Sequence, residues 1–157
     1  MALITSRTQA DVLARNEKGV YRAEDLNRVE SAAGALSQDL QCMEEALRAY
    51  AQAQGVPWQE SFSLPFEPQA ASLAARTDWT PADWPTGPQM RRYLQNIRKL
   101  CGLLEVPAES LPQTMSGLTW QGANAIEQTL LNCQQAAAQL EREKKTLIEE
   151  QKGGDVL

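Results

Sequence analysis

The sequence predicts an all-α protein: a helical bundle with two long coiled-coil-like helices, one shorter helix, and a connection rich in proline and tryptophan. Apolar residues recur at alternating steps of three and four in three separate segments, the spacing of helices that pack along narrow seams. Residues that begin and end helices flank those segments. The length of 157 residues is that of one domain, so we expect residues 1–157 to form a single helical domain.

A short helix is expected first, within residues 1–20. Thr8 suits its N-cap, and Asp11 stands at the capping-box position three residues later. Gly19 is expected to stop this helix, because glycine is favoured just past a helix end.

The first long helix is expected over residues 23–54, closed by Gly55 and Pro57. At 1.5 Å per residue, its apolar seam spans roughly 36 Å. The charged residues between the seam positions, including Arg28 and Glu30, are expected to form a solvated face. The seam consists of Leu26, Val29, Ala33, Leu36, Leu40, Met43, Leu47 and Tyr50.

Residues 55–86 are expected to form a structured connection that contains several prolines. Phe62, Leu64 and Phe66 alternate with polar or proline positions, so a few extended residues are expected there. The stretch ASLAARTD, residues 71–78, is a candidate for one helical turn.

Two helix starts follow one another at the end of this connection. The stretch TPAD (80–83) has a hydroxyl N-cap, a proline at the first helical position and a carboxylate three residues on. That helix should last about one turn, because Trp84 precedes Pro85 and is pushed out of the α region. The stretch TGPQ (86–89) repeats the pattern and is expected to begin the shorter helix, over residues 87–104.

The tryptophans Trp58, Trp79, Trp84 and Trp120 all lie at or between predicted helix ends. We expect them to plug the ends of a narrow bundle, where each ring buries on the order of 200 Å². The alternative is an aromatic platform for a glycan or a partner protein. Asp78 and Asp83 are interpreted as helix-start residues in preference to a glycosidase carboxylate pair.

A third seam predicts the second long helix, over residues 120–151, which Gly153-Gly154 is expected to end. Lys144 interrupts the apolar spacing before Leu147 resumes it. The final third is mostly charged, with a Glu141 to Lys145 pair, and is expected to need a partner. The seams of the shorter and the second long helix are Met90, Leu94, Ile97, Cys101 and Leu104, and Ala123, Ile126, Leu130, Cys133, Ala137 and Leu140.

Composition excludes several classes of function. A net charge of −5 argues against nucleic-acid binding, which depends on clustered Lys and Arg. With no histidine, Ser-His and Cys-His nucleophile pairs and His-containing zinc sites are excluded, which leaves only paired carboxylates and magnesium-type clusters. No enzyme activity, cofactor or metal is expected. No apolar run is long enough for a signal peptide or a membrane span, so a soluble protein is expected. The cysteines Cys42, Cys101 and Cys133 are expected to be free and buried.

Seams this narrow must lie against other helices, either in the same chain or in copies of it. Within one chain, an antiparallel three-helix bundle would leave the end of the third seam projecting. Between chains, we expect homo-oligomers, with a trimer preferred. The candidate interface residues are Leu26, Val29, Leu36, Leu40, Met43, Leu47, Trp79, Trp84, Trp120, Ile126, Leu130, Leu140 and Leu147.

Four segments of the chain resemble a family of small proteins encoded in the tail-gene regions of phages and prophages of Firmicutes. They are ITSRTQADV (4–12), YRAEDLNRV (21–29), TDWTPADWPTGPQMRRYLQNIRKL (77–100) and GLTWQGANAIEQTLL (117–131), in the family's order. Two departures are visible: Trp84 stands where an aliphatic residue is commoner, and Trp120 where tyrosine is usual.

The resemblance implies a virion structural protein of the tail, baseplate or fibre region, made in the host cytoplasm, that contacts itself or other tail proteins. No active site carries over from this family. Two alternatives stay open: a cytoplasmic assembly adaptor or chaperone for a tail protein, and a receptor-binding module whose tryptophans stack on cell-wall glycans.

Overall fold

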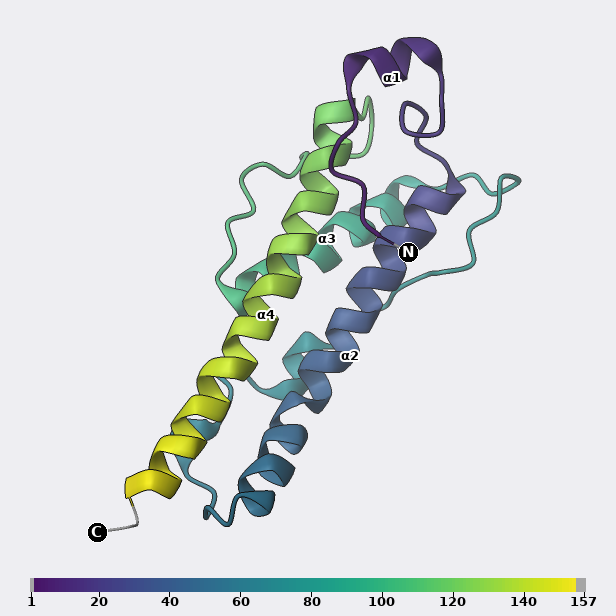
Figure 1. Cartoon of the computed structure of the whole chain (residues 1–157). Coiled ribbons are helices and arrows are strands. Elements are labelled where there is room, and N and C mark those ends of the chain that lie inside the picture. The colour runs from purple at the N-terminus through teal and green to yellow at the C-terminus, as the bar shows by residue number, and fades with distance from the viewer. Residues whose placement is uncertain (1, 155–157) are drawn as a thin grey trace.

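The computed structural model describes residues 2–154, which form helices joined by turns and irregular segments, with no β-strand among them. The all-α prediction is therefore confirmed. Two long helices lie side by side, and a shorter helix runs across them (Figure 1). In chain order the elements are α1 (Gln9–Ala14), α2 (Ala23–Ala53), the 3₁₀ turns η1 (Glu60–Phe62) and η2 (Pro68–Ala71), α3 (Gly87–Leu104) and α4 (Trp120–Gly154).

The long helices α2 and α4 run in the same direction. Near their starts Arg28 donates to Glu127, and near their ends Lys152 donates to Gln54. The antiparallel three-helix bundle, one of the arrangements that the sequence left open, is therefore not the one observed. Antiparallel neighbours are joined by short loops. Here residues 54–119 carry the chain back along the bundle before α4 begins at the same end as α2 (Figure 1).

The apolar seam of α2 is buried within this single chain. Its residues are buried from Leu26 to Leu47, and Tyr50 is half-buried at the end. Contacts from α4, α3 and η2 cover it, so the helix has the neighbours that a narrow seam requires. The predicted bounds of 23–54 differ from the observed helix by one residue.

The seam of α4 is buried from Ala123 to Ala137, but its last third follows a different phase from the one expected. Ile148 is fully buried, whereas Leu147 is 38% exposed, so the expectation that Leu147 resumes the seam is wrong. Lys144 occupies the buried stripe one turn earlier. Its ammonium reaches out to the carbonyl of Ser61 at 3.0 Å, as a long basic side chain can.

The charged end of α4 does not project from the molecule. Lys145 pairs with Glu141 at 3.1 Å, and its ammonium lies 5.3 Å from the centre of the Tyr50 ring. Tyr50 also donates a hydrogen bond to Glu149. The partner that this end requires is thus α2. The helix continues through Gly154, so the glycine pair does not end it at residue 151.

The N-terminal helix α1 begins as expected and ends sooner. Thr8 and Asp11 form the capping box, but Arg15 adopts the left-handed conformation, with φ of 52°, directly after Ala14. The expectation that Gly19 stops the helix is therefore wrong. Gly19 instead permits a close approach: a Cβ atom there would lie 2.0 Å from the carbonyl oxygen of Asp11.

The connection packs against the long helices. Phe62, Leu64 and Ala71 are buried, and the Ser37 hydroxyl donates to the carbonyl of Ala71 at 2.6 Å. The helical turn expected over residues 71–78 is wrong, because the turn is η2, which Pro68 begins. The stretch TPAD forms a single turn, and the capping box of Thr86 and Gln89 begins α3 as predicted.

The phase of α4 can be tested by two neighbouring substitutions. We expect Ile148→Ala to lower the free energy of unfolding by about 2 kcal/mol, since it leaves a cavity in the core. Leu147→Ala should change it by less than about 0.5 kcal/mol. Urea unfolding followed by circular dichroism measures both values. Equal losses for the two variants would contradict the phase described here.

Candidate functional site

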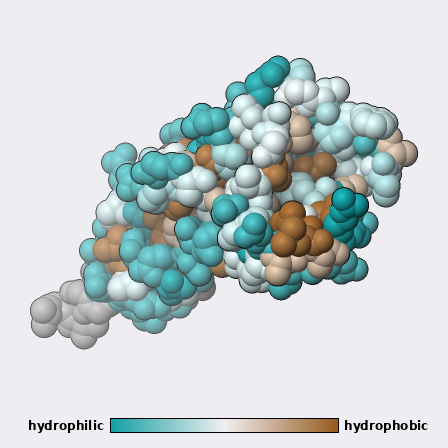
Figure 2. All heavy atoms as spheres, turned by 90° about the horizontal axis from the view of Figure 1, so that it is seen from above, coloured by the Kyte–Doolittle hydropathy of each residue, from teal (hydrophilic) through white to brown (hydrophobic). Residues whose placement is uncertain are grey.

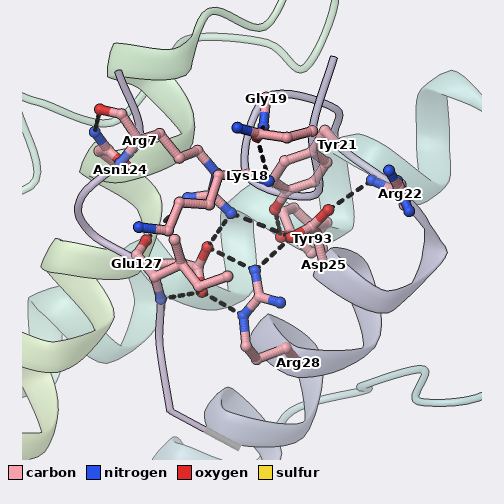
Figure 3. A network of polar contacts seen from close by, with 12 residues as sticks. Arg7, Lys18, Gly19, Tyr21, Arg22, Asp25, Arg28, Tyr93, Asn124 and Glu127 are labelled. Atoms are coloured by element: carbon pink, nitrogen blue, oxygen red, sulfur yellow. Dashed lines mark hydrogen bonds and ion pairs between the residues drawn. The ribbon is translucent and has the colours of Figure 1, made fainter. Parts of the chain in front are cut away.

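A buried ionic cluster, consisting of Arg7, Asp25, Arg28 and Glu127, lies where the N-terminal segment crosses the starts of α2 and α4 (Figure 3). All four side chains are almost completely buried, and Glu127 has no exposed surface. Two guanidinium groups and two carboxylates make the cluster neutral in sum. Buried charges are tolerated only when they are paired and hydrogen-bonded in this way.

Glu127 is the centre of the cluster. Its carboxylate accepts hydrogen bonds from Arg28 Nε and Arg7 Nη2, both at 2.6 Å, and from the backbone amide of Ile4 at 2.9 Å. The hydrogen bond to Glu127 raises the pKa of Arg28 above its ordinary value, so this guanidinium stays charged. Removing the Glu127 carboxylate would leave two buried arginines with only Asp25 to neutralise them.

Asp25 joins the cluster to the beginning of α2. One carboxylate oxygen accepts from both arginines of the cluster, and the other accepts from the backbone amide of Arg22 at 2.7 Å, which completes the capping box. Asn124 holds the same N-terminal segment from α4, because its side-chain amide bonds both the amide and the carbonyl of Arg7, at 3.0 and 2.9 Å. The cluster therefore fixes three segments of the chain to one another.

Two tyrosines extend this network toward α3. The hydroxyls of Tyr21 and Tyr93 share a hydrogen bond, and the Arg7 guanidinium lies 5.6 Å from the centre of the Tyr21 ring. Burial raises the pKa of both phenols well above the ordinary value of 10, so both are protonated at neutral pH. Because these pKa values are raised by folding, their contribution to stability is complete below pH 10 and is lost as the pH rises above it.

A second set of buried contacts attaches the connection to α2. Glu30 accepts from the indole nitrogen of Trp79 at 2.5 Å and from Arg92 at 3.1 Å. Asn27 bonds both the amide and the carbonyl of Trp79, each at 2.8 Å. Trp79 is thus an anchor inside the fold, only 4% exposed, and its ring is not available to stack on a ligand.

The solvated face expected on α2 is wrong at Arg28 and Glu30, which are 6% and 2% exposed. Apart from Asp25, which bonds Arg28 within α2, their partners are distant in sequence: Glu127 for Arg28, and Trp79 and Arg92 for Glu30. Helical periodicity reports only apolar spacing, so it could not reveal them. Each of the segments 4–12, 21–29, 77–100 and 117–131 contributes at least one residue to the ionic cluster or the tyrosine pair.

Trp84 lies on the surface beside this buried network, at the end of a fixed turn. The Asp83 carboxylate accepts from the amide and the hydroxyl of Thr80, and those bonds lower the pKa of Asp83. Arg76 pairs with both Asp83 and Asp78. The two aspartates thus have a structural role here. Trp84 itself is 92% exposed, so the expectation that it plugs the bundle is wrong.

A groove opens between α3 and residues 113–118, with a volume of about 770 Å³. Its apolar lining comes from both sides and from the segment after Trp84. Arg91 and Arg98 also line it, and no aspartate or glutamate does. Neither arginine forms an ion pair with a carboxylate in residues 2–154. The main apolar lining residues are Pro85, Met90, Leu94, Met115 and Leu118.

The end of the molecule that carries α1 adds further exposed apolar surface. Figure 2 looks onto this end and shows a hydrophobic patch among hydrophilic residues. The exposed large hydrophobic side chains of this part of the chain are Val12, Leu13 and Val20. The hollow beside α1 and the groove beside α3 both border on Tyr21, so these surfaces are neighbours.

Comparison of the chain with protein-family models, curated proteins and solved structures finds no match. Over the described residues, no helix combines the length and the apolar character that crossing a membrane requires. The same residues contain no group of three or more Cys, Asp or Glu side chains placed to hold a metal ion.

Most of the interface candidates are core residues of one chain. The sequence left open whether the seams would pack within a chain or between copies, and in this structure they pack within it. Trp120 and Leu140 are half-buried, and only Trp84 and Leu147 are exposed. The buried candidates are Leu26, Val29, Leu36, Leu40, Met43, Leu47, Trp79, Ile126 and Leu130.

Two cysteines meet in the core between α3 and α4. The sulfurs of Cys101 and Cys133 lie 3.7 Å apart, whereas Cys42 is exposed, contrary to the expectation that it is buried. The hydrogen bond between the two thiols, together with burial, raises the pKa of Cys133, and the same hydrogen bond lowers the pKa of Cys101. Both side chains are buried, so an oxidant reaches the thiols only when the fold opens.

We expect glutathione disulfide to oxidise this pair slowly, as the fold opens, to an intrachain disulfide. Two thiols lose two electrons and two protons, and the oxidant becomes two glutathione molecules. In a Cys42→Ser background, mass spectrometry should show a loss of two hydrogen atoms, and the free energy of unfolding should rise by about 3 kcal/mol. A Cys133→Ala variant is the control. Unchanged mass, or a less stable oxidised form, would contradict this prediction.

Proposed function

We propose that this protein is a structural component of the tail, baseplate or fibre region of a phage or prophage virion, which docks on a neighbouring virion protein. Its docking face is the surface around Trp84, the groove beside α3 and the exposed side of α1. The family resemblance of four segments supports the location in a virion. Exposed Trp84, on a turn fixed by Arg76 and Asp83, is the observation that carries the docking role.

In the structure of residues 2–154 the Trp84 side chain is 92% exposed, and an apolar ring of this size is costly to keep in water. Docking would bury on the order of 200 Å² of its surface. Tryptophan is enriched among the few residues that dominate binding energy in protein interfaces. Because the turn is already fixed, little conformational entropy is lost when a partner covers the ring.

The buried ionic cluster supports the same proposal in a different way. It holds the N-terminal segment, α2 and α4 in one arrangement, and the tyrosine pair adds α3. Buried polar networks of this kind can specify a unique geometry, which an assembly part requires. The seams that would form a trimer are filled within the chain, so self-association would also use the exposed face.

The test is the protein content of purified particles, together with one substitution. We expect mass spectrometry to detect the chain in virions and Trp84→Ala to reduce its incorporation at least about tenfold, as expected for a hot-spot residue. Thermal stability should not change, because the side chain is exposed. Leu147→Ala, an exposed apolar residue at the other end, is the matched control and should be incorporated normally.

Absence of the chain from particles, with recovery of a complex with a tail protein in infected cells, would favour the assembly adaptor. Normal incorporation of Trp84→Ala would reject the docking face. A glycan platform has less support, because only one of its two expected rings is exposed: the Trp79 ring is buried and bonded to Glu30.

A further inference from the structure

The groove beside α3 differs in charge from the rest of the chain. The protein has a net charge of −5, yet the residues that line this groove include two arginines and no carboxylate. Positive charge without a counter-charge in a surface groove favours negatively charged ligands. Two arginines are too few for a nucleic-acid backbone, which needs many phosphate contacts. The charges fit a short segment with a few carboxylates.

The positions of the arginines define a spacing. Arg91 and Arg98 are seven residues apart on α3, so they lie two turns apart on the same face, with Leu94 between them. At 1.5 Å per residue, their Cα atoms are separated by roughly 10 Å along the axis. Two carboxylates seven residues apart on a partner helix would match this spacing. Apolar side chains between them would face Leu94.

The lining of the groove suits apolar side chains. Met90 and Met115 lie on opposite walls, and methionine adapts its shape to different ligands because it is unbranched and flexible. The volume of about 770 Å³ accommodates several side chains but not a whole helix. Pro85 lines the same groove, so a segment seated in it would lie beside the exposed ring of Trp84.

The Arg98 side chain is held in one orientation at the groove. One of its nitrogens donates to the carbonyl of Pro112 at 2.7 Å, which orients the guanidinium and holds the opposite wall. Arg91 is exposed and makes no ion pair within the described chain. The two side chains thus offer one oriented and one adaptable cation at the two ends of an apolar floor.

We infer that this groove binds an acidic amphipathic segment of a partner protein, in which two carboxylates flank large apolar side chains. The inference rests on the proposed docking function and names the chemistry of the partner. Helix-in-groove recognition of this kind uses apolar anchors at helical spacing. The positive charges of the two arginines favour the binding of acidic segments over basic ones.

The test uses the full chain and two labelled peptides in fluorescence anisotropy titrations. One peptide carries leucines at helical spacing with glutamates on both sides, and the other has lysine at every glutamate position. We expect the acidic peptide to bind at least tenfold more tightly. Arg91→Glu should weaken the acidic peptide at least fivefold and strengthen the basic one. Arg142→Glu, an exposed residue outside the groove, makes the same charge change and should alter neither.

Two further measurements keep the outcomes separate. Arg91→Lys keeps the positive charge, so it should retain most of the affinity for the acidic peptide that Arg91→Glu loses. Unfolding curves of each variant must match that of the unchanged protein, which is expected because Arg91 makes no ion pair within residues 2–154. Equal binding of both peptides, or an acidic affinity that Arg91→Glu leaves unchanged, would overturn the inference. Dodecanoate that binds more tightly than the acidic peptide and displaces it would also overturn it, in favour of a small-molecule site.

Failure of this inference and failure of the proposed function give different results. If incorporation into particles depends on Trp84 but not on Arg91, the docking function stands and the acidic partner is rejected. The chain could instead be absent from particles while Arg91→Glu still weakens binding of the acidic peptide and strengthens binding of the basic one. The groove then binds acidic segments in another setting, and the virion role is rejected.

Discussion

Glu127→Ala is expected to lower the free energy of unfolding by about 3–5 kcal/mol, since it leaves two buried guanidinium groups without their main counter-charge. Glu127 accepts hydrogen bonds from both arginines of the cluster and from the N-terminal segment. We therefore expect early exposure of residues 2–8 in hydrogen exchange, before the long helices open. Urea unfolding measures the loss of stability.

The control for this variant is Glu150→Ala, an exposed glutamate on the same helix, which should change stability by less than about 0.5 kcal/mol. Glu127→Gln keeps the shape of the side chain and removes its charge, so its loss should be intermediate. A stability change for Glu127→Ala as small as that of the exposed control would show that the cluster contributes little to the fold.

Leu40→Ala is the second large effect, with an expected loss of about 2–5 kcal/mol from a cavity in the seam of α2. Leu40 has no exposed surface and lies midway along the seam, where the surrounding helices cannot close the space easily. For a chain of this length, such a loss lowers the melting temperature by roughly 5–15 °C. Differential scanning calorimetry measures both quantities.

Leu13→Ala removes the same atoms from a site that is 79% exposed on α1, and its melting temperature should not change measurably. If Leu40→Ala and Leu13→Ala had the same melting temperature, the seam of α2 would not be the core of the fold. A fall in the cooperativity of unfolding that occurs in Leu40→Ala and not in Leu13→Ala would show that α2 and α4 no longer unfold as one unit.

The helices could be predicted because the information that specifies them is local. The capping box of Thr86 and Gln89, with Pro88 between them in the first turn, places the start of α3 at the residue expected. The seam of α2 from Leu26 to Leu47 is likewise visible as a spacing and is buried as predicted. The same method failed at Leu147, because the charged end of α4 offers two apolar neighbours and periodicity alone does not choose between them.

The candidate site could be predicted only in part. Trp84 was identified as a candidate interface residue, but so was Trp79, and the two have opposite environments. Both stand beside helix-start residues, so their local sequences are alike. What separates them is a set of distant contacts: Glu30 and Asn27 bind Trp79, whereas Trp84 is 92% exposed in the structure of residues 2–154. The groove was not predicted at all, because its walls come from α3 and a later segment.

The sequence by itself determined that this protein is helical, where its three main helices lie, and which of their faces are apolar. Those properties depend on hydrogen bonds and side-chain spacing within a few residues. Only the tertiary structure decided that α2 and α4 run parallel, that Arg28 and Glu30 are buried, and that Trp84 is exposed. The physical reason is that charge pairing joins residues far apart in sequence, such as Arg7 and Glu127, and is absent from any local pattern.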